Sequence, residues 1–130
     1  GKKIVYIDLD GVLVDYRNTD ALDKYEGFLP YDGATEFFNE LQNHFEVYLL
    51  STAPWSNPRA WADKVNWVQR YLGPGAFKKL IISHNKSLNK GDYLIDDRPN
   101  NGAAGFGGEW LHFGPGNKFP DYKSVLDYLI

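Results

Sequence analysis

The chain has no cysteine among its 130 residues, which excludes disulfide bonds, thiolate nucleophiles and zinc sites built on thiolates. It also lacks any apolar run near the roughly 20 residues that a membrane-spanning helix needs. A signal peptide is not expected, because Asp8 and Asp10 interrupt the apolar segment near the N-terminus. We therefore expect a cytoplasmic protein that does not associate with membranes.

Clusters of basic residues are missing as well. Lysine and arginine contribute 14 residues against 17 aspartates and glutamates, which gives a formal net charge of −3. The adjacent basic pairs at residues 2–3 and 78–79 each precede an apolar segment, so they are expected to be solvated flanks of strands. This distribution argues against a surface for duplex nucleic acid. The 43% of hydrophobic residues is enough for the core of a single domain over residues 1–130.

Short apolar segments along the chain predict strands, and they are too continuous to belong to a sheet with one solvated face. They cover residues 4–7, 45–50, 80–82, 93–95 and 110–113. Helical patterns alternate with these segments, which is typical of right-handed crossovers between parallel strands. The sequence therefore predicts an α/β fold. We expect a three-layer, doubly wound, Rossmann-like parallel sheet of about five strands with helices on both faces.

The predicted helices have recognisable beginnings. Residues 33–45 carry apolar residues at helical spacing, and Asp32 is placed to cap them. Residues 58–72 follow Asn57, a second candidate cap, and Asp121 begins a last short helix. The apolar face of the second helix is predicted to consist of Trp61, Val65, Val68 and Leu72.

Polar side chains follow four of the predicted strands, at the edge where a sheet of this kind binds its ligand. The first strand leads into Asp8 and Asp10, and the fourth leads into Asp96 and Asp97. The remaining polar groups at this edge are Ser51, Thr52 and Lys86. Carboxylates crowded in this way repel one another unless a cation or a shared proton relieves the repulsion. The sequence therefore predicts a cation-binding site at these strand ends.

The residue types at these strand ends suit phosphoryl transfer. Oxygen ligands without histidine or thiolate favour a hard cation such as Mg²⁺, which commonly binds carboxylates together with a phosphate oxygen. Asp8 is placed to attack phosphorus and form an aspartyl-phosphate. Asp10 points to the same side of an extended chain, where it could protonate the leaving alcohol and then activate water. We therefore predict a phosphatase that hydrolyses a phosphomonoester.

These motifs resemble those of a known superfamily. The segments DLDGV (residues 8–12) and IDDRP (residues 95–99), the hydroxyl pair after VYLL, and Lys86 look like the four motifs of the haloacid dehalogenase (HAD) superfamily of Mg²⁺-dependent phosphohydrolases. More narrowly, DLDGVLVDY, STAPW, the helix ending in QRYLGP, NKS and FPDYKSVLDYL are similar to the 5′(3′)-deoxyribonucleotidase family. The resemblance implies a HAD-like fold and a small phosphomonoester, a nucleotide, as the substrate.

The resemblance also implies roles for single residues. Asp8 would be the nucleophile, and Asp10 would be the general acid and base whose backbone carbonyl also binds Mg²⁺. Asp97 or Asp96 would supply the further metal carboxylate, so the implied metal ligands are Asp8, Asp10, Asp96 and Asp97. Tyr16 would lie against the nucleobase.

For the phosphate group, the resemblance implies one hydroxyl and one lysine. The hydroxyl is that of Thr52 or Ser51, and the alignment with the family's loop favours Thr52. Lys86 is favoured over Lys90 because of its spacing to the second acid pair.

One interval departs from the family pattern. The family inserts a helical cap domain between the first and second motifs, whereas residues 15–32 leave room only for a minimal cap loop. Residues 17–30 are expected to form at most a loop or a short helix. A site without a full cap would also admit larger phosphoesters, and a nucleic-acid end or a phosphoprotein is the alternative substrate.

A signalling receiver domain is a further alternative, because it combines a phosphorylated aspartate with an acid pair, a hydroxyl, a lysine and Mg²⁺. A receiver would carry that aspartate at the end of its third strand, but residues 80–82 are followed by Ser83 and His84. A phosphate-binding module without turnover would leave the presence of Asp10 unexplained. The sequence leaves the oligomeric state open.

Overall fold

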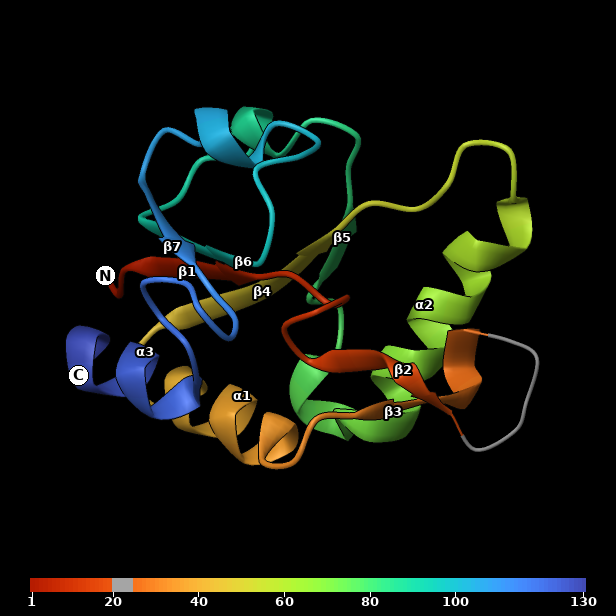
Figure 1. Cartoon of the computed structure of the whole chain (residues 1–130), viewed down its shortest axis with the longest axis horizontal. Helices are drawn as coiled ribbons and strands as arrows, with labels where there is room; N and C mark the ends of the chain where they lie inside the picture. Colours follow the sequence, from red (N-terminus) through yellow and green to blue (C-terminus); the bar gives the residue numbers. More distant parts are fainter. Residues whose placement is uncertain (20–24) are drawn as a thin grey trace.

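The computed structural model describes residues 1–19 and 25–130, and Figure 1 shows the arrangement of the elements. The main sheet of this described part has five strands, all parallel. They are β1 (Ile4–Ile7), β4 (Glu46–Ser51), β5 (Leu80–Ile82), β6 (Tyr93–Asp96) and β7 (Glu109–His112). Each strand begins and ends within one residue of its predicted bounds, because continuous apolar runs form strands that are covered on both faces.

The spatial order of these strands is β5-β4-β1-β6-β7. Counted along the chain from first to fifth, they follow the order 3-2-1-4-5. This is the start of the doubly wound Rossmann order, whereas receiver domains have the order 2-1-3-4-5. The receiver alternative is therefore wrong. The order reverses between β1 and β6, so Asp8 after β1 and Asp96 at the end of β6 lie at the switch point, where such sheets bind ligands.

The two faces of the sheet are covered unequally (Figure 1). α1 (Ala34–Gln42), α2 (Pro58–Tyr71) and α3 (Tyr122–Leu129) share the larger hydrophobic core with the strands. The opposite face carries the short 3-10 helices η3 (Lys86–Leu88) and η4 (Ala103–Gly105), with a smaller core. The predicted doubly wound fold with helices on both faces is confirmed, with a thin second layer. Within the described residues, no helix has the length and apolar character required to cross a bilayer.

The ends of the helices agree with the predictions in part. α1 begins after Gly33, whose φ is 82°, so Asp32 is not its cap and that prediction is wrong. Asn57 occupies the N-cap position of α2 as predicted, but its side chain makes no capping hydrogen bond. Asp121 caps α3 as expected, because its carboxylate accepts a hydrogen bond from the Ser124 N–H at 2.9 Å.

The buried face of α2 differs from the prediction. Val65 is 41% exposed and Trp61 is partly exposed, although Val68 and Leu72 are buried. The buried residues of α2 are Ala60, Asp63, Lys64, Trp67 and Val68. The helix presents this face because the Trp67 ring packs in the main core and the Lys64 ammonium pairs with Asp10. Apolar periodicity does not encode an ion pair between distant residues.

The interval between the first two motifs forms a hairpin, so the prediction of at most a loop or a short helix is wrong. β2 (Val14–Thr19) pairs antiparallel with β3 (Phe28–Pro30), and the 3-10 helix η1 (Tyr25–Gly27) precedes β3. The part of this prediction that concerns residues 20–24 lies outside the described residues. The Trp67 indole N–H donates a hydrogen bond to the Phe28 carbonyl at 2.9 Å and ties the hairpin to α2. A two-stranded ribbon depends on such tertiary contacts, so its local sequence predicts it poorly.

Candidate active site

A tight turn after β1 sets the positions of the first two aspartates. The Leu9 carbonyl accepts hydrogen bonds from three following backbone N–H groups at 2.8 to 3.1 Å. Gly11 in this turn has a φ of 78°, and a Cβ at this position would overlap the Asp97 carboxylate. Glycine is therefore required by the backbone conformation and by the close approach of Asp97. The turn brings the first acid pair against the second.

Three of the predicted metal ligands form a cluster. Asp8, Asp96 and Asp97 each place a carboxylate oxygen within 4.8 Å of the others. Burial, and secondly the charge of Asp96, raise the pKa of Asp8 well above its usual value and the pKa of Asp97 to about 6. The Asp97 Oδ1 atom is buried and has no hydrogen-bond partner in the described part of the chain. A hard divalent cation fits this set, because it would supply the missing partner and offset the repulsion.

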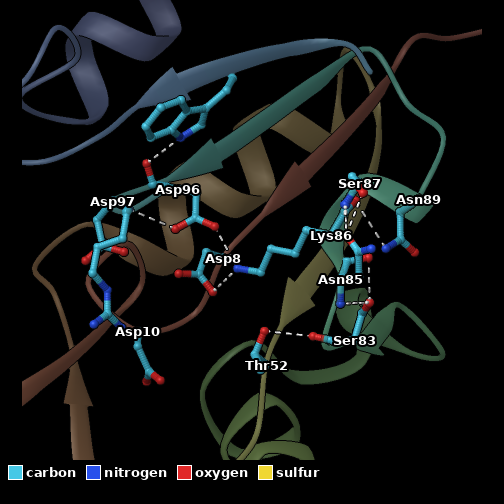
Figure 2. A network of polar contacts seen from close by, with 12 residues as sticks. Asp8, Asp10, Thr52, Ser83, Asn85, Lys86, Ser87, Asn89, Asp96 and Asp97 are labelled. Carbon is cyan, nitrogen blue, oxygen red and sulfur yellow. Dashed lines mark hydrogen bonds and ion pairs between the residues drawn. The ribbon is translucent and has the colours of Figure 1, made fainter. Parts of the chain in front are cut away.

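The Lys86 side chain points to one carboxylate of each acid pair, Asp8 and Asp96, as Figure 2 shows. Its Nζ atom is 3.1 Å from Asp8 Oδ1 and 2.7 Å from Asp96 Oδ2. Burial opposes the charge of Lys86, but the two carboxylates outweigh burial and raise the pKa of the ammonium. Lys86 therefore stays protonated at neutral pH. Breaking a buried arrangement of this kind is costly, because each remaining partner would be an unpaired buried charge.

A network of short hydrogen bonds holds the backbone around Lys86 in place (Figure 2). The Asn85 side-chain oxygen accepts hydrogen bonds from the Ser87 N–H at 3.1 Å and from the Ser87 hydroxyl at 2.5 Å. The Lys86 N–H donates to the Asn101 carbonyl at 2.7 Å. These bonds fix the start of η3, so that the long lysine side chain leaves the backbone in one direction, toward Asp8.

The two predicted phosphate-binding hydroxyls differ in their partners. The Thr52 hydroxyl donates a hydrogen bond to the Ser83 carbonyl at 2.7 Å (Figure 2). The Ser51 hydroxyl is buried, and no described residue is its hydrogen-bond partner. Both residues line the same cavity as Asp8. The hydroxyl hydrogen of Ser51 is therefore the one that is free to reach a ligand.

The Asp10 carboxylate lies apart from the metal cluster. Its Oδ2 atom is 3.0 Å from the Lys64 ammonium, and its Oδ1 atom accepts a hydrogen bond from the Tyr25 hydroxyl at 2.6 Å. Lys64 is only 2% exposed although it is a lysine in the middle of a helix. The side chain of Asp10 is therefore held by Lys64 and Tyr25, away from the three clustered carboxylates.

The contacts of Lys64 and Tyr25 with Asp10 were not predicted from the sequence. A lysine in an amphipathic helix is expected on its solvated side, and Tyr25 lies in an interval that was expected to form at most a loop or a short helix. The sequence holds one weak indication, which is the helical spacing of Ala60, Lys64 and Trp67 on a common face of α2.

Two cavities meet at Asp10. The first, of about 420 Å³, is lined mainly by polar groups that include Asp8, Ser51, Thr52, Lys86 and Asp96. The second, of about 620 Å³, lies between the hairpin and α2 and is lined by residues that include Tyr16, Tyr25, Phe28, Asp63 and Lys64. Asp10, Pro54 and Arg98 line both cavities. The predicted substrate contact Tyr16 is therefore in the second cavity, while the predicted phosphate ligands are in the first.

Comparison with known sequences gives this site a family. The model of the family described as 5′ nucleotidase, deoxy (pyrimidine), cytosolic type C protein matches residues 16–118. The chain belongs to this family. A Vibrio phage KVP40 protein that carries the name 5′(3′)-deoxyribonucleotidase is 51% identical over 145 positions, which cover 98% of this chain and 85% of the relative. A Bordetella pertussis protein with the same name is 41% identical over 71 positions, which cover 54% of this chain and 38% of the relative.

A solved structure agrees with the family assignment at the level of the fold. A haloacid dehalogenase-like hydrolase from Streptococcus pneumoniae superposes with a TM-score of 0.64 at 14% sequence identity, over 98% of this chain and 91% of that one. The predicted HAD-like fold and the predicted family are therefore confirmed, and the chain is a phosphatase of the deoxyribonucleotidase-like group. The phage alignment is longer than the 130 residues of this chain, so the phage protein has residues without a counterpart here.

Proposed function

We propose that this phosphatase requires Mg²⁺, acts on nucleoside monophosphates as a 5′(3′)-deoxyribonucleotidase, and works through an aspartyl-phosphate on Asp8. The observation that carries the proposal is the meeting of two unlike cavities at Asp10. One cavity is lined by acids, hydroxyls and a lysine, which suit a phosphate and a cation. The other is lined in part by aromatic rings, which suit a nucleoside.

In the first step, a carboxylate oxygen of Asp8 attacks phosphorus while the bond between phosphorus and the ester oxygen breaks. Asp10, in its protonated form, gives its proton to that oxygen, and the nucleoside leaves as a neutral alcohol. Lys86, at 3.1 Å from Asp8, and Ser51, whose hydroxyl has no partner among the described residues, would donate to the phosphoryl oxygens.

In the second step, Asp10 takes a proton from a water molecule as the water oxygen attacks phosphorus. The bond between phosphorus and the Asp8 oxygen breaks, and its electron pair returns to the Asp8 carboxylate. Inorganic phosphate leaves, and Asp10 is protonated again for the next substrate. Two protonation states of one carboxyl therefore serve both halves of the reaction.

The carboxylates of Asp8, Asp96 and Asp97, together with the Asp10 backbone carbonyl that the family resemblance implies, would hold the cation. Mg²⁺ held there would withdraw charge from the phosphoryl oxygens and help to orient them. The Asp97 Oδ1 atom, which is buried and has no partner within the described ranges, supports this assignment, because a buried carboxylate oxygen without a partner is costly.

The second cavity supports a nucleoside as the leaving group. Asp10 lies between the two cavities, so an ester oxygen beside it directs the phosphate into the first cavity and the alcohol into the second. The Tyr16 ring lines the second cavity and is 46% exposed, so it could stack on a base. The hairpin that carries Tyr16 and Tyr25 stands at the place in the chain where the family inserts its cap, so the minimal cap forms one wall of the cavity.

Phosphate release from a panel of esters tests the proposal. The panel contains 3′- and 5′-monophosphates of deoxyribonucleosides and ribonucleosides, sugar phosphates, phosphoamino acids and 5′-phosphorylated oligonucleotides, each with Mg²⁺ and with a chelator. We expect Mg²⁺-dependent turnover that is fastest for deoxyribonucleoside monophosphates. Fastest turnover of oligonucleotides or phosphoamino acids would instead assign a larger phosphoester as the substrate.

A further inference from the structure

The two oxygens of the Asp10 carboxylate are held by donors from separate elements. The Tyr25 hydroxyl in η1 donates to Oδ1 at 2.6 Å, and the Lys64 ammonium in α2 lies 3.0 Å from Oδ2. These contacts join residues that are 15 and 54 positions apart in the chain. The carboxylate therefore has a fixed orientation at the junction of the two cavities, and one of its donors comes from the minimal cap.

We propose that Tyr25 is a positioning residue for acid–base catalysis, whose hydroxyl, together with Lys64, keeps the Asp10 carboxyl directed at the leaving-group oxygen. The inference rests on the proposed function, because it assigns to Asp10 the proton transfers described above. It goes beyond that function, since it makes the short hairpin part of the catalytic step and not only a wall of the nucleoside cavity.

The chemistry of a tyrosine hydroxyl suits this task. A phenol can donate a hydrogen bond and accept one, so it can hold Asp10 when the carboxyl is ionised and also when it is protonated. An ammonium can only donate, so Lys64 can bond only to an Asp10 oxygen that carries no proton.

The ring of Tyr25 is itself fixed in place. It meets the Phe28 ring edge to face, with centroids 5.5 Å apart and an angle of 71° between the planes. The Lys64 ammonium lies 4.2 Å from the centroid of the Tyr25 ring, in the geometry of a cation–π contact. The hydroxyl is thus directed by packing on two sides, as a positioning group requires.

The dependence of the rate on the leaving group tests the inference. A nucleoside alcohol is a poor leaving group that needs a proton, whereas the nitrophenolate released from p-nitrophenyl phosphate needs almost none. Tyr25→Phe keeps the ring and removes only the hydroxyl. We expect it to lower kcat about tenfold for a deoxyribonucleoside monophosphate and less than about twofold for p-nitrophenyl phosphate.

Two further variants complete the experiment. Tyr128→Phe is the matched control, because Tyr128 donates to the Glu109 carboxylate on an exposed surface away from both cavities, and it should leave both rates unchanged. Lys64→Met removes the other donor to Asp10 and should show the same selectivity for the poor leaving group. Thermal unfolding of each variant shows that it is folded.

The outcomes separate the two proposals. An equal loss of kcat for both esters, or no loss for either, in Tyr25→Phe and Lys64→Met would overturn the positioning role while leaving the phosphatase assignment intact. If the wild-type protein released phosphate from neither ester in the presence of Mg²⁺, the proposed function would fail, and the inference would fail with it.

Discussion

The two cavities that meet at Asp10 are built in different ways. The first is lined by residues that follow the strands of one parallel sheet, and its Asp8, Ser51, Lys86 and Asp96 are nearly fully buried. The second is formed by the hairpin and α2, and Tyr16 on its wall is half exposed. Phosphoryl transfer needs charges held in a fixed geometry, which a sheet provides, whereas a leaving group can be accommodated by an adaptable wall. The proposed function thus assigns chemistry and substrate choice to separate parts of this small fold.

Replacement of the proposed nucleophile Asp8 should have the largest effect on kcat, and it should alter only the first cavity. Asp8→Asn should lower kcat by at least about four orders of magnitude, because an amide cannot form the proposed covalent intermediate. Phosphate release with Mg²⁺ is the measurement. The second cavity should still bind a deoxyribonucleoside monophosphate, which equilibrium dialysis can detect. Turnover by Asp8→Asn at a rate near that of the wild type would exclude Asp8 as the nucleophile.

Asp10 belongs to both cavities, and its replacement should have the next largest effect. Asp10→Asn keeps the size of the side chain but cannot exchange a proton, so kcat for a nucleoside monophosphate should fall by about two to four orders of magnitude. The loss should be smaller for p-nitrophenyl phosphate, which is the readout that distinguishes lost proton transfer from general damage. A loss of less than about tenfold for both esters would assign proton transfer to another group.

A change in the second cavity should have a smaller effect of a different kind. Tyr16→Ala should raise KM for a deoxyribonucleoside monophosphate about fivefold to tenfold, because a half-exposed ring gives the lower range of stacking energies. The value of kcat should stay close to that of the wild type, since Tyr16 does not line the first cavity. A lower kcat with an unchanged KM in this variant would contradict the separate roles of the two cavities.

The smallest expected effect concerns stability without metal. Asp97 has a pKa of about 6 in the folded protein against 3.8 in the unfolded chain, and the pKa of Asp8 is raised in the same direction. The folded state therefore binds protons more tightly, and this stabilisation is complete below about pH 4 and is lost as the pH rises through about 6.

With a chelator present, the free energy of unfolding should fall by on the order of 1 kcal/mol over this pH window, after allowing for the partial exposure of Asp97. Urea unfolding at a series of pH values measures the fall. Mg²⁺ should remove it, because the cation favours the ionised carboxylates. Asp97→Asn is the control: in the chelator, its free energy of unfolding should depend less on pH than that of the wild type. A free energy of unfolding that rises with pH in the chelator would contradict the clustering of these acids.

The same contrast explains what the sequence alone could predict. The five strands and the residues at their ends were predictable, because a continuous apolar run that stops at an aspartate or a serine is a local pattern. Asp8, Asp96 and Asp97 could be brought together by topology alone, once the strand order was fixed by right-handed crossovers.

The second cavity was not predictable in this way. The buried face of α2 depends on an ion pair between Lys64 and Asp10, which lie 54 residues apart, and the hairpin depends on its contact with Trp67. The same dependence left the hydrogen bond from Tyr25 to Asp10 unpredicted. Such features follow from tertiary contacts, and neither helical periodicity nor strand propensity reports them.

The most direct test of the account is a crystal structure of the Asp8→Asn variant with Mg²⁺ and a deoxyribonucleoside monophosphate. We predict the phosphate in the first cavity beside residue 8 and Lys86, the metal among the acid cluster, the ester oxygen next to Asp10, and the base against Tyr16 in the second cavity. A nucleotide whose base lay outside the second cavity, or whose phosphate lay away from Lys86, would contradict the division of the site into these two parts.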